Sequence, residues 1–207
     1  MSETFTDGIH AVIYDDFEKE FLESIRYIFV DDTQQNTYSI ANASFILKVG
    51  SEIEGIAKTI CERNNLHKSG HVFDHDCIPK NKPEIETIAV VSDNFHFQKV
   101  ENTILHPFKK DEKKTGREWM TYGWNNAYQN LKHGTLEDIK QYGTIRYMMR
   151  SLAALYLLNY ALTGRFLNSS FLCYVSGDKI VGKGFGLVWD NLIDLSDEQK
   201  AYLQDKS

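Results

Sequence analysis

The chain has 207 residues, of which 42% are apolar and 25% are charged, as expected for a globular protein and not for a disordered chain. Its formal net charge is −6, so the surface as a whole repels nucleic acid, and any contact with nucleic acid requires a local basic patch. We expect one helical domain over residues 1–207, in which residues 165–207 form a C-terminal appendage of β-strand and helix.

The cysteines and the apolar runs predict a cytoplasmic protein that does not enter a membrane. Cys61, Cys77 and Cys173 are odd in number and far apart, which is typical of reduced thiols and not of a disulfide framework. The N-terminal MSETFTDGIHAV lacks the apolar core of a signal peptide. The most apolar run, LAALYLLNYAL at 152–162, is shorter than the roughly 20 residues that span a membrane, so a buried helix is predicted there.

Apolar residues at helical spacing predict a first helix over about residues 15–30 and a second over about 37–63. Gly50 and Gly55 lie inside the second helix, where each costs about 1 kcal/mol relative to alanine unless it permits close helix packing. Residues 85–108 contain β-branched residues and a short alternation, so this segment is compatible with either short strands or helix.

Two further helices are predicted, over about residues 117–133 and 136–163. Gly134 and Gly164 follow them as expected C-terminal caps, and Thr135 can cap the start of the second. The later segments SSFLCYV and KIVGKGFGLVW have β-strand composition and are separated by the turn-forming SGD, which predicts a hairpin. The expected fold is therefore mainly α, a bundle of four or five main helices with a small β-hairpin near the C-terminus.

The segment WNNAYQNLKHG at 124–134 carries the candidate site. At 100° per residue, Trp124, Tyr128 and Leu131 fall in one sector with Met120, which is predicted to face the core. On the opposite side, a polar stripe within about 60° comprises Asn126, Asn130 and His133.

A histidine at the C-terminal end of a helix is stabilised in its protonated form, and imidazole suits proton transfer or contact with phosphate. On this interpretation His133 transfers a proton or contacts phosphate, Lys132 neutralises phosphate, and Asn126 and Asn130 orient the ligand. The alternative is that this stripe is simply the solvent-exposed face of an amphipathic helix.

The order of PF (107–108), a polar loop, W-x₃-Y-x₂-LKHG and a long helix containing LAALYLL resembles that of HEPN-like domains. The resemblance covers residues 39–164 by order of elements and 107–162 by motif. It implies a helical bundle, often dimeric, and a metal-independent ribonuclease in a bacterial toxin, abortive-infection or defence system. The partner that it implies is RNA or a nucleotide.

The nuclease motif of that family is an arginine, four to six intervening residues, and a histidine. His133 matches the histidine, but Asn126, Ala127 and Tyr128 occupy the positions of the arginine. An arginine offsets the charge that develops on phosphorus, so Lys132, Arg117 or Arg146 would have to substitute for it. Two hypotheses remain open: an RNA- or nucleotide-binding domain, and a non-catalytic module that forms a homodimer or binds a helical protein.

Three other motifs contain residues of chemical interest. The loop HKSGHVFDHDC offers a candidate zinc or nickel site, but its Ser-Gly interrupts any helix; the candidate ligands are His67, His71, His75 and Cys77. GKGFG at 182–186 lacks the helix that a phosphate-binding loop precedes, so a glycine-rich hairpin is expected and no cofactor is predicted. A basic cluster, either a solvated loop or an RNA-facing patch, comprises Lys109, Lys110, Lys113, Lys114 and Arg117.

Overall fold

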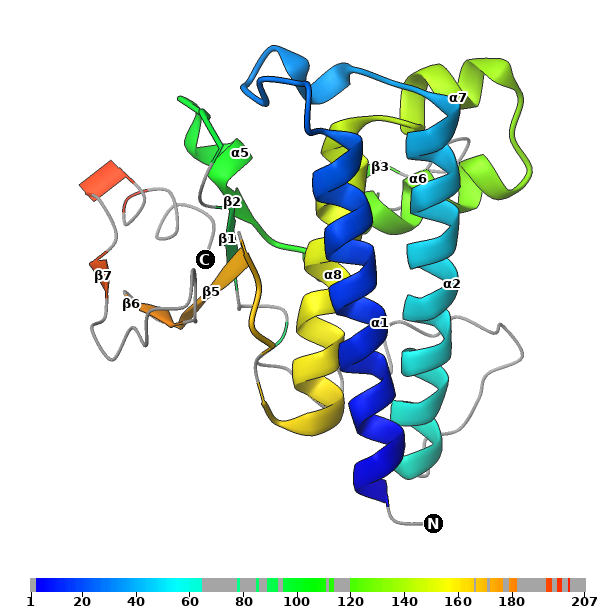
Figure 1. The fold of residues 1–207 in the computed structure, drawn as a ribbon, viewed down its shortest axis with the longest axis vertical. Coiled ribbons are helices and arrows are strands. Elements are labelled where there is room, and N and C mark those ends of the chain that lie inside the picture. Colours follow the sequence, from blue (N-terminus) through cyan, green and yellow to red (C-terminus); the bar gives the residue numbers. More distant parts are fainter. Residues whose placement is uncertain are drawn as a thin grey trace.

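A computed structural model describes residues 3–64, 78, 85, 89–92, 95–110, 112–113, 120–165, 167–170, 172–176, 179–181, 193–194, 197–198 and 201. It confirms the mainly α class. Three long helices lie side by side (Figure 1): α1 (Glu3–Ser24), α2 (Ile40–Arg63) and α8 (Ile145–Thr163). Shorter elements complete the helical part: the 3₁₀ turn η1 (Gln34–Asn36), α5 (Val100–Thr103), α6 (Gly123–Lys132) and α7 (Leu136–Tyr142).

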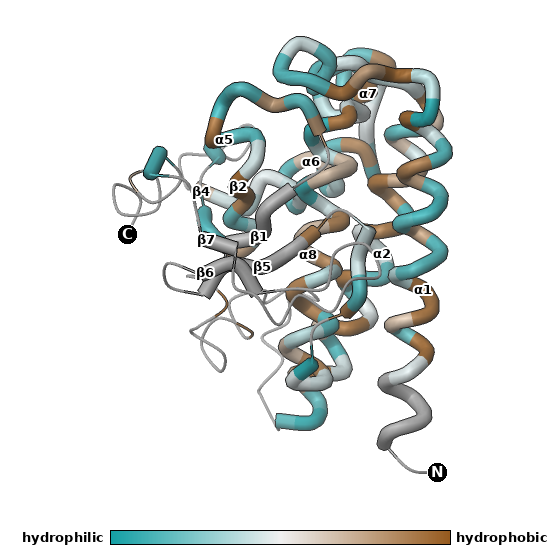
Figure 2. The backbone as a smooth tube through the Cα atoms, turned by 60° about the vertical axis from the view of Figure 1, so that its left-hand side comes forward, coloured by the Kyte–Doolittle hydropathy of each residue, from teal (hydrophilic) through white to brown (hydrophobic). Residues whose placement is uncertain are grey.

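The helix α8 forms the centre of the core. Residues 151–159 are all buried, because α1, α2 and α6 contact this helix on different sides. Hydrophobic and hydrophilic residues alternate along α1 and α2, as expected for helices with one exposed face (Figure 2). The prediction of a buried helix at 152–162 is confirmed, and none of the described helices is long and apolar enough to cross a membrane.

The helix α1 begins well before the predicted start at residue 15 and ends earlier than residue 30. Its buried stripe, Tyr14, Glu18, Phe21 and then Ile25, follows helical spacing. Beyond Ser24 the chain turns toward η1, and the Asp31 carboxylate accepts hydrogen bonds from the backbone and hydroxyl of Thr33. At the end of α1 itself, the N–H groups of Arg26 and Ile28 donate to the carbonyls three residues back, at Glu23 and Ile25, so the regular α-helical pattern ends before this turn.

The helices α2 and α6 pack closely at Gly50. A Cβ atom placed there would lie 2.3 Å from the ring of Tyr128, so only glycine fits at this contact. Gly55, one and a half turns further on, is exposed and has no atom within 4 Å of such a Cβ. Close packing therefore explains the glycine at 50 but not the one at 55.

The predicted single helix over 136–163 is wrong, since the chain breaks between α7 and α8. The backbone N–H of Ser39 donates to the carbonyl of Gly143, and that of Ile145 donates to the carbonyl of Thr37, both at 3.1 Å. These hydrogen bonds join the start of α2 to the start of α8. Their partners, residues 37–39, lie about 100 residues away in sequence. The periodicity of residues 136–163 therefore gives no sign of the break.

The predicted caps are partly confirmed. Thr135 and Asp138 form a capping box at the start of α7, and Gly164 closes α8 in the left-handed region at φ 69°. Gly134 does not cap α6 in that way, because the positive-φ glycine of the described residues is Gly164 and α6 ends with His133 as its C-cap.

A sheet packs beside α8, on the side away from α1 and α2 (Figure 1). Its order is β2-β1-β5-β6-β7 and every pairing is antiparallel: β1 (Ala89–Ser92), β2 (Ile104–Leu105), β5 (Leu172–Ser176), β6 (Lys179–Val181) and β7 (Ile193–Asp194). The predicted hairpin is present, since β5 pairs with β6, but it belongs to a five-stranded sheet, because β1 and β2 come from the ambiguous segment 85–108 and β1 pairs with β5. A second sheet pairs β3 (Glu112–Lys113) with β4 (Met120–Thr121).

Candidate functional site: a cationic pocket where α6 and α8 begin

The four predicted site residues lie in α6 and at its C-terminal end. His133 is exposed and forms the C-cap of the helix. The Lys132 ammonium lies 3.7 Å from Oε1 of Glu54 and 5.4 Å from the centre of the Tyr128 ring. Burial and the hydrogen bond to Glu54 raise the pKa of Tyr128, so this phenol stays neutral. Lys132 therefore serves the contact between α6 and α2 in this structure.

Asn126 does not lie on an exposed face, and the assignment of the stripe to the side opposite the core is wrong at this residue. Asn126 is 5% exposed, because α6 is covered by α2, α7 and α8 on several sides and not on one. Nδ2 of Asn130 donates to the carbonyl of Asn126 at 2.7 Å and lies 3.1 Å from its Oδ1. The two carboxamides are brought together, whereas His133 lies at the exposed end of the helix.

The predicted core face of the same helix is confirmed for Trp124, Tyr128 and Leu131, which are all buried. Met120 is 45% exposed, since it lies in β4 and the helix begins only at Gly123. Helical periodicity therefore does not describe the position of residue 120.

Two other predicted sites fall outside the described residues. The candidate metal ligands His67, His71, His75 and Cys77 belong to that part, as do the glycines of GKGFG at 182–186. Within the described part, no group of three or more histidine, cysteine, aspartate or glutamate side chains could hold a metal ion. Cys61 is a buried thiol in α2.

A pocket of about 620 Å³ opens at the other end of α6, near the start of α8. Five cationic side chains line it, with two carboxylates: Lys99, Lys109, Lys110, Arg146 and Arg150, and Asp32 and Glu101. Uncharged residues complete the lining: Gln35, Asn36, Asn102, Ile104, Leu105, His106, Pro107, Gly123 and Trp124. The lining carries an excess of positive charge in a chain whose net charge is −6.

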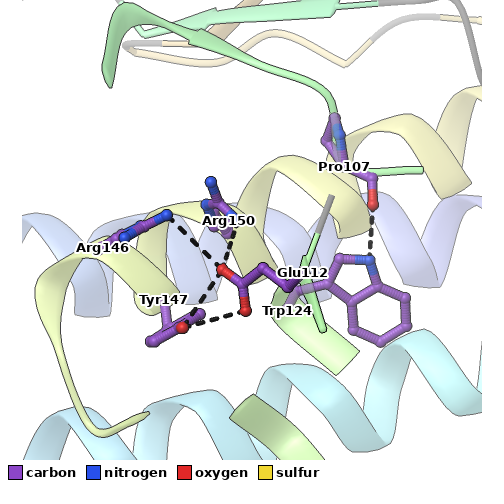
Figure 3. A network of polar contacts seen from close by, with 6 residues as sticks. All are labelled: Pro107, Glu112, Trp124, Arg146, Tyr147 and Arg150. Atoms are coloured by element: carbon purple, nitrogen blue, oxygen red, sulfur yellow. Dashed lines mark hydrogen bonds and ion pairs between the residues drawn. The ribbon is translucent and has the colours of Figure 1, made fainter. Parts of the chain in front are cut away.

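Glu112 of β3 holds both pocket arginines (Figure 3). Nη1 of Arg150 donates to Oε1 of Glu112 at 2.8 Å, and Nη2 of Arg146 lies 3.6 Å from the same oxygen. The Tyr147 hydroxyl donates to the carboxylate at 3.1 Å. Burial and the charge of Glu112 raise the pKa of Tyr147, which keeps the phenol protonated as a donor. One carboxylate is therefore shared by two guanidinium groups.

The N-terminus of α6 adds further positive potential beside these arginines. A Cβ atom at Gly123, the first residue of α6, would lie 2.2 Å from Nη1 of Arg150, so the absence of a side chain allows the guanidinium to lie against the helix start. A helix N-terminus carries roughly half a positive charge on its unpaired N–H groups. The Glu112 carboxylate faces the same helix start, since its Oε1 would lie 3.0 Å from that Cβ atom.

Aromatic rings support the wall of the pocket. The indole N–H of Trp124 donates to the carbonyl of Pro107 at 2.9 Å (Figure 3). The rings of Tyr122 and Trp124 are nearly parallel with centroids 6.1 Å apart, and Phe108 meets both edge to face. The Lys110 ammonium lies 5.7 Å from the Tyr122 ring centre. These contacts fix the backbone at 107–110, from which two of the pocket lysines project.

On the opposite side, Asp32 fixes the start of α5. Its Oδ2 accepts from the backbone N–H of Gln98 at 2.8 Å and from that of Lys99 at 3.2 Å, and its Oδ1 accepts from Asn102 at 2.6 Å. This carboxylate is thus used to position α5, and its charge reduces the excess of positive charge in the pocket.

Part of this pocket is visible in the amino-acid sequence. Lys109 and Lys110 belong to the predicted basic cluster and do line it, whereas Lys113 is exposed in β3 and Lys114 and Arg117 are outside the described residues. Arg146 and Arg150 are four residues apart, a spacing that places both on one helix face. No local pattern marks Glu112 as their partner.

Comparison with protein-family models, with characterised proteins and with solved structures finds no match to this chain. The resemblance to HEPN-like domains, and the defence role and dimer that it implies, therefore remain predictions.

Proposed function

We propose that this protein binds RNA or a nucleotide, and that the pocket at the start of α6 and α8 receives the phosphate groups. The observation that carries the proposal is the convergence of five cationic side chains and one helix N-terminus on a single cavity. Arginine and lysine side chains together with helix N–H groups are the usual partners of protein-bound phosphate.

The charge balance of the pocket favours an anionic ligand. Arg150 and Glu112 have side chains that are 17% and 15% exposed, so water screens their charges only partly. Arg146 is more exposed and lies further from the shared carboxylate, which leaves its guanidinium able to contact a ligand as well. A phosphate at this position would share the two guanidinium groups with Glu112.

The size of the pocket favours an organic phosphate over a simple ion. A volume of about 620 Å³ lies within the range of cavities that hold drug-sized ligands, which is roughly 300–1,000 Å³. Both polar and apolar groups line it, including the amides of Gln35 and Asn102 and the side chains of Ile104 and Leu105. Such a lining suits a ligand with a base or sugar beside its phosphate.

The catalytic role of His133 is a separate part of the proposal. His133 lies ten residues after Gly123, or about 15 Å along a helix axis, so a mononucleotide in the pocket would not contact both. An extended RNA could reach both. If His133 takes part in cleavage, His133→Ala should abolish cleavage of a labelled RNA while its affinity is retained; equal cleavage by both proteins would remove that role.

Binding is tested by removing the two pocket lysines. We expect Lys109→Ala/Lys110→Ala to weaken the binding of a short labelled RNA by about 5- to 30-fold, since each charged contact contributes about 1 kcal/mol or more. Fluorescence anisotropy measures the change.

The matched control is Lys19→Ala/Lys58→Ala, which removes the same charge from exposed positions of α1 and α2. If the two double variants lose affinity equally, the effect is one of net charge and the pocket is not the binding site. If the unmodified protein binds neither RNA nor nucleotides, the proposed function is wrong.

A further inference from the structure

Beside the pocket lies a group of exposed aromatic side chains. Tyr27 is 90% exposed and Phe29 is 64% exposed, whereas large apolar residues are usually covered. The ring of Phe29 stacks on that of exposed His96, with centroids 4.2 Å apart and an interplanar angle of 8°. The Arg26 guanidinium lies 5.6 Å from the centre of the Tyr27 ring. We call Tyr27, Phe29 and His96 the aromatic platform.

Backbone contacts hold the two halves of the platform together. His96 N–H donates to the carbonyl of Val30 at 3.1 Å, and His96 forms a β-bridge with Asp31. Segments 29–32 and 96–99 are thus joined side by side, with Asp32 hydrogen-bonded to the backbone of Lys99. The stacking of Phe29 on His96 is therefore supported by backbone contacts between their two segments.

The platform lies close to the pocket along two segments of the chain. Phe29 and His96 each precede a pocket-lining residue by three positions, namely Asp32 and Lys99. Three residues of extended chain span at most about 11 Å. The Cα atoms of Phe29 and His96 therefore lie within about that distance of the Cα atoms of Asp32 and Lys99, which line the pocket.

Exposed rings beside converging cations are the features that bind single-stranded nucleic acid. Bases stack on aromatic side chains, and the backbone phosphates follow the positive charge. The ring of Phe29 that stacks on His96 keeps most of its surface accessible, and Arg26 adds a cation beside Tyr27. A folded protein could also pack against exposed rings, but it would not require a cationic cavity beside them. The positive charge of the pocket therefore favours a single-stranded nucleic acid over a protein as the ligand.

We propose that the aromatic platform stacks the unpaired bases of a single-stranded nucleic acid whose phosphates enter the adjacent pocket. This inference rests on the proposed function, and it narrows the ligand from any nucleotide to an unpaired chain. A mononucleotide would occupy the pocket but not the platform, whereas a strand of several nucleotides would contact both.

The experiment compares Phe29→Ala and Tyr27→Ala with the unmodified protein, using anisotropy with four labelled probes. These are a short single-stranded RNA, a DNA of the same sequence, an abasic strand with the same phosphates, and the RNA annealed to its complement. Both substitutions are at exposed positions, so the fold should be retained, and circular dichroism checks this. Phe29→Trp is the conservative control, since it keeps an aromatic face.

We expect each alanine variant to bind the single strand more weakly by about 5- to 150-fold per base unstacked, with affinity for the abasic strand unchanged and affinity retained in Phe29→Trp. The unmodified protein should bind the single strand more tightly than the duplex. A larger affinity for RNA than for DNA would identify the 2′-hydroxyl as a contact, and equal affinity would identify stacking and phosphate contact as sufficient.

Two outcomes would overturn the inference while leaving the proposed function intact: unchanged affinity of the alanine variants for the single strand, or an equal loss for the abasic strand. In either case Lys109→Ala/Lys110→Ala would still weaken phosphate binding. If the unmodified protein binds none of the four probes, and no mononucleotide either, the proposed function fails as well.

Discussion

Single residues decide how closely the helices approach. Because Gly50 has no side chain, the Tyr128 ring can lie against the surface of α2. For the same reason the Arg150 guanidinium can lie beside Gly123 at the start of α6. Gly50 lies inside α2, where glycine costs about 1 kcal/mol relative to alanine, whereas Gly123 is the first residue of α6. The close approach of Tyr128 offsets the cost at Gly50, whereas no side chain approaches Gly55 in the same way.

The two glycines of α2 therefore give opposite predictions. Gly50→Ala should lower the free energy of unfolding by about 1–3 kcal/mol, because the new methyl group and the Tyr128 ring cannot both fit without displacement. Gly55→Ala should raise it by about 0.5–1 kcal/mol through helix propensity. Urea unfolding followed by circular dichroism measures both, and stabilisation by both substitutions would show that the α2–α6 interface has room for a methyl group.

At the scale of elements, Glu112 joins β3 to the first turns of α8. It accepts hydrogen bonds from Arg150 and Tyr147 and forms an ion pair with Arg146, so the β3–β4 segment is attached to the helix that carries the pocket arginines. The same carboxylate competes with any anion for those guanidinium groups. Stability and ligand affinity are therefore opposed at this residue.

Removing the charge of Glu112 should lower the stability of the protein and raise its affinity for RNA. We expect Glu112→Gln to lower the free energy of unfolding by about 1–3 kcal/mol, since a partly buried ion pair loses one partner. Its affinity for a single-stranded RNA should rise by about 5-fold or more as both arginines gain capacity for phosphate.

Tyr147→Phe provides the control for that substitution. It removes one hydrogen bond to Glu112 and no charge, so we expect a loss of about 0.5–1.5 kcal/mol in stability without tighter binding. Denaturant unfolding and anisotropy on the same preparations report both quantities. Weaker RNA binding by Glu112→Gln would show that the arginines need their carboxylate to be positioned for the ligand.

For the whole molecule, the net charge of −6 and the cationic pocket act in opposite directions on a nucleic acid. The ligand is repelled by the general surface and attracted locally, so salt should weaken binding by screening the local contacts. The logarithm of the affinity for a single strand should fall linearly with the logarithm of salt concentration.

The slope of that line should be smaller for Lys109→Ala/Lys110→Ala by up to about 1.4, since each phosphate contact with a single strand contributes about 0.7. Anisotropy titrations at a series of salt concentrations measure it. Lys19→Ala/Lys58→Ala should keep the slope of the unmodified protein, and an unchanged slope in the pocket variant would mean that its lysines contact no phosphate.

The helices were predictable wherever one face is buried, because apolar periodicity reports burial directly. This holds for α2 and for the buried, largely apolar part of α8, and the caps Thr135 and Gly164 were predictable from local chemistry. The break at Gly143 was not, since hydrogen bonds from 37–39 cause it. The burial of Asn126 was not predictable either, because a helical wheel assumes one covering neighbour and α6 has several.

The pocket was predictable only in pieces. Lys109 and Lys110 belong to a visible basic run, and Arg146 with Arg150 shows a same-face spacing. The cavity itself arises from residues near 32–36, 99–110, 123–124 and 146–150, which only the tertiary fold brings together. The same limit applies to the aromatic platform, whose stacked rings come from positions 29 and 96.

The break between α7 and α8 also has a kinetic consequence. Because the main chain at 143–145 is bonded to 37–39, the first turns of α8 are held at one rotation relative to α2, and the two arginines are preorganised. On the protein side, binding then orders mainly the long lysine side chains, so the protein contributes little to the conformational entropy cost. Association should then be fast and governed by diffusion and electrostatic steering, without a slow closing step.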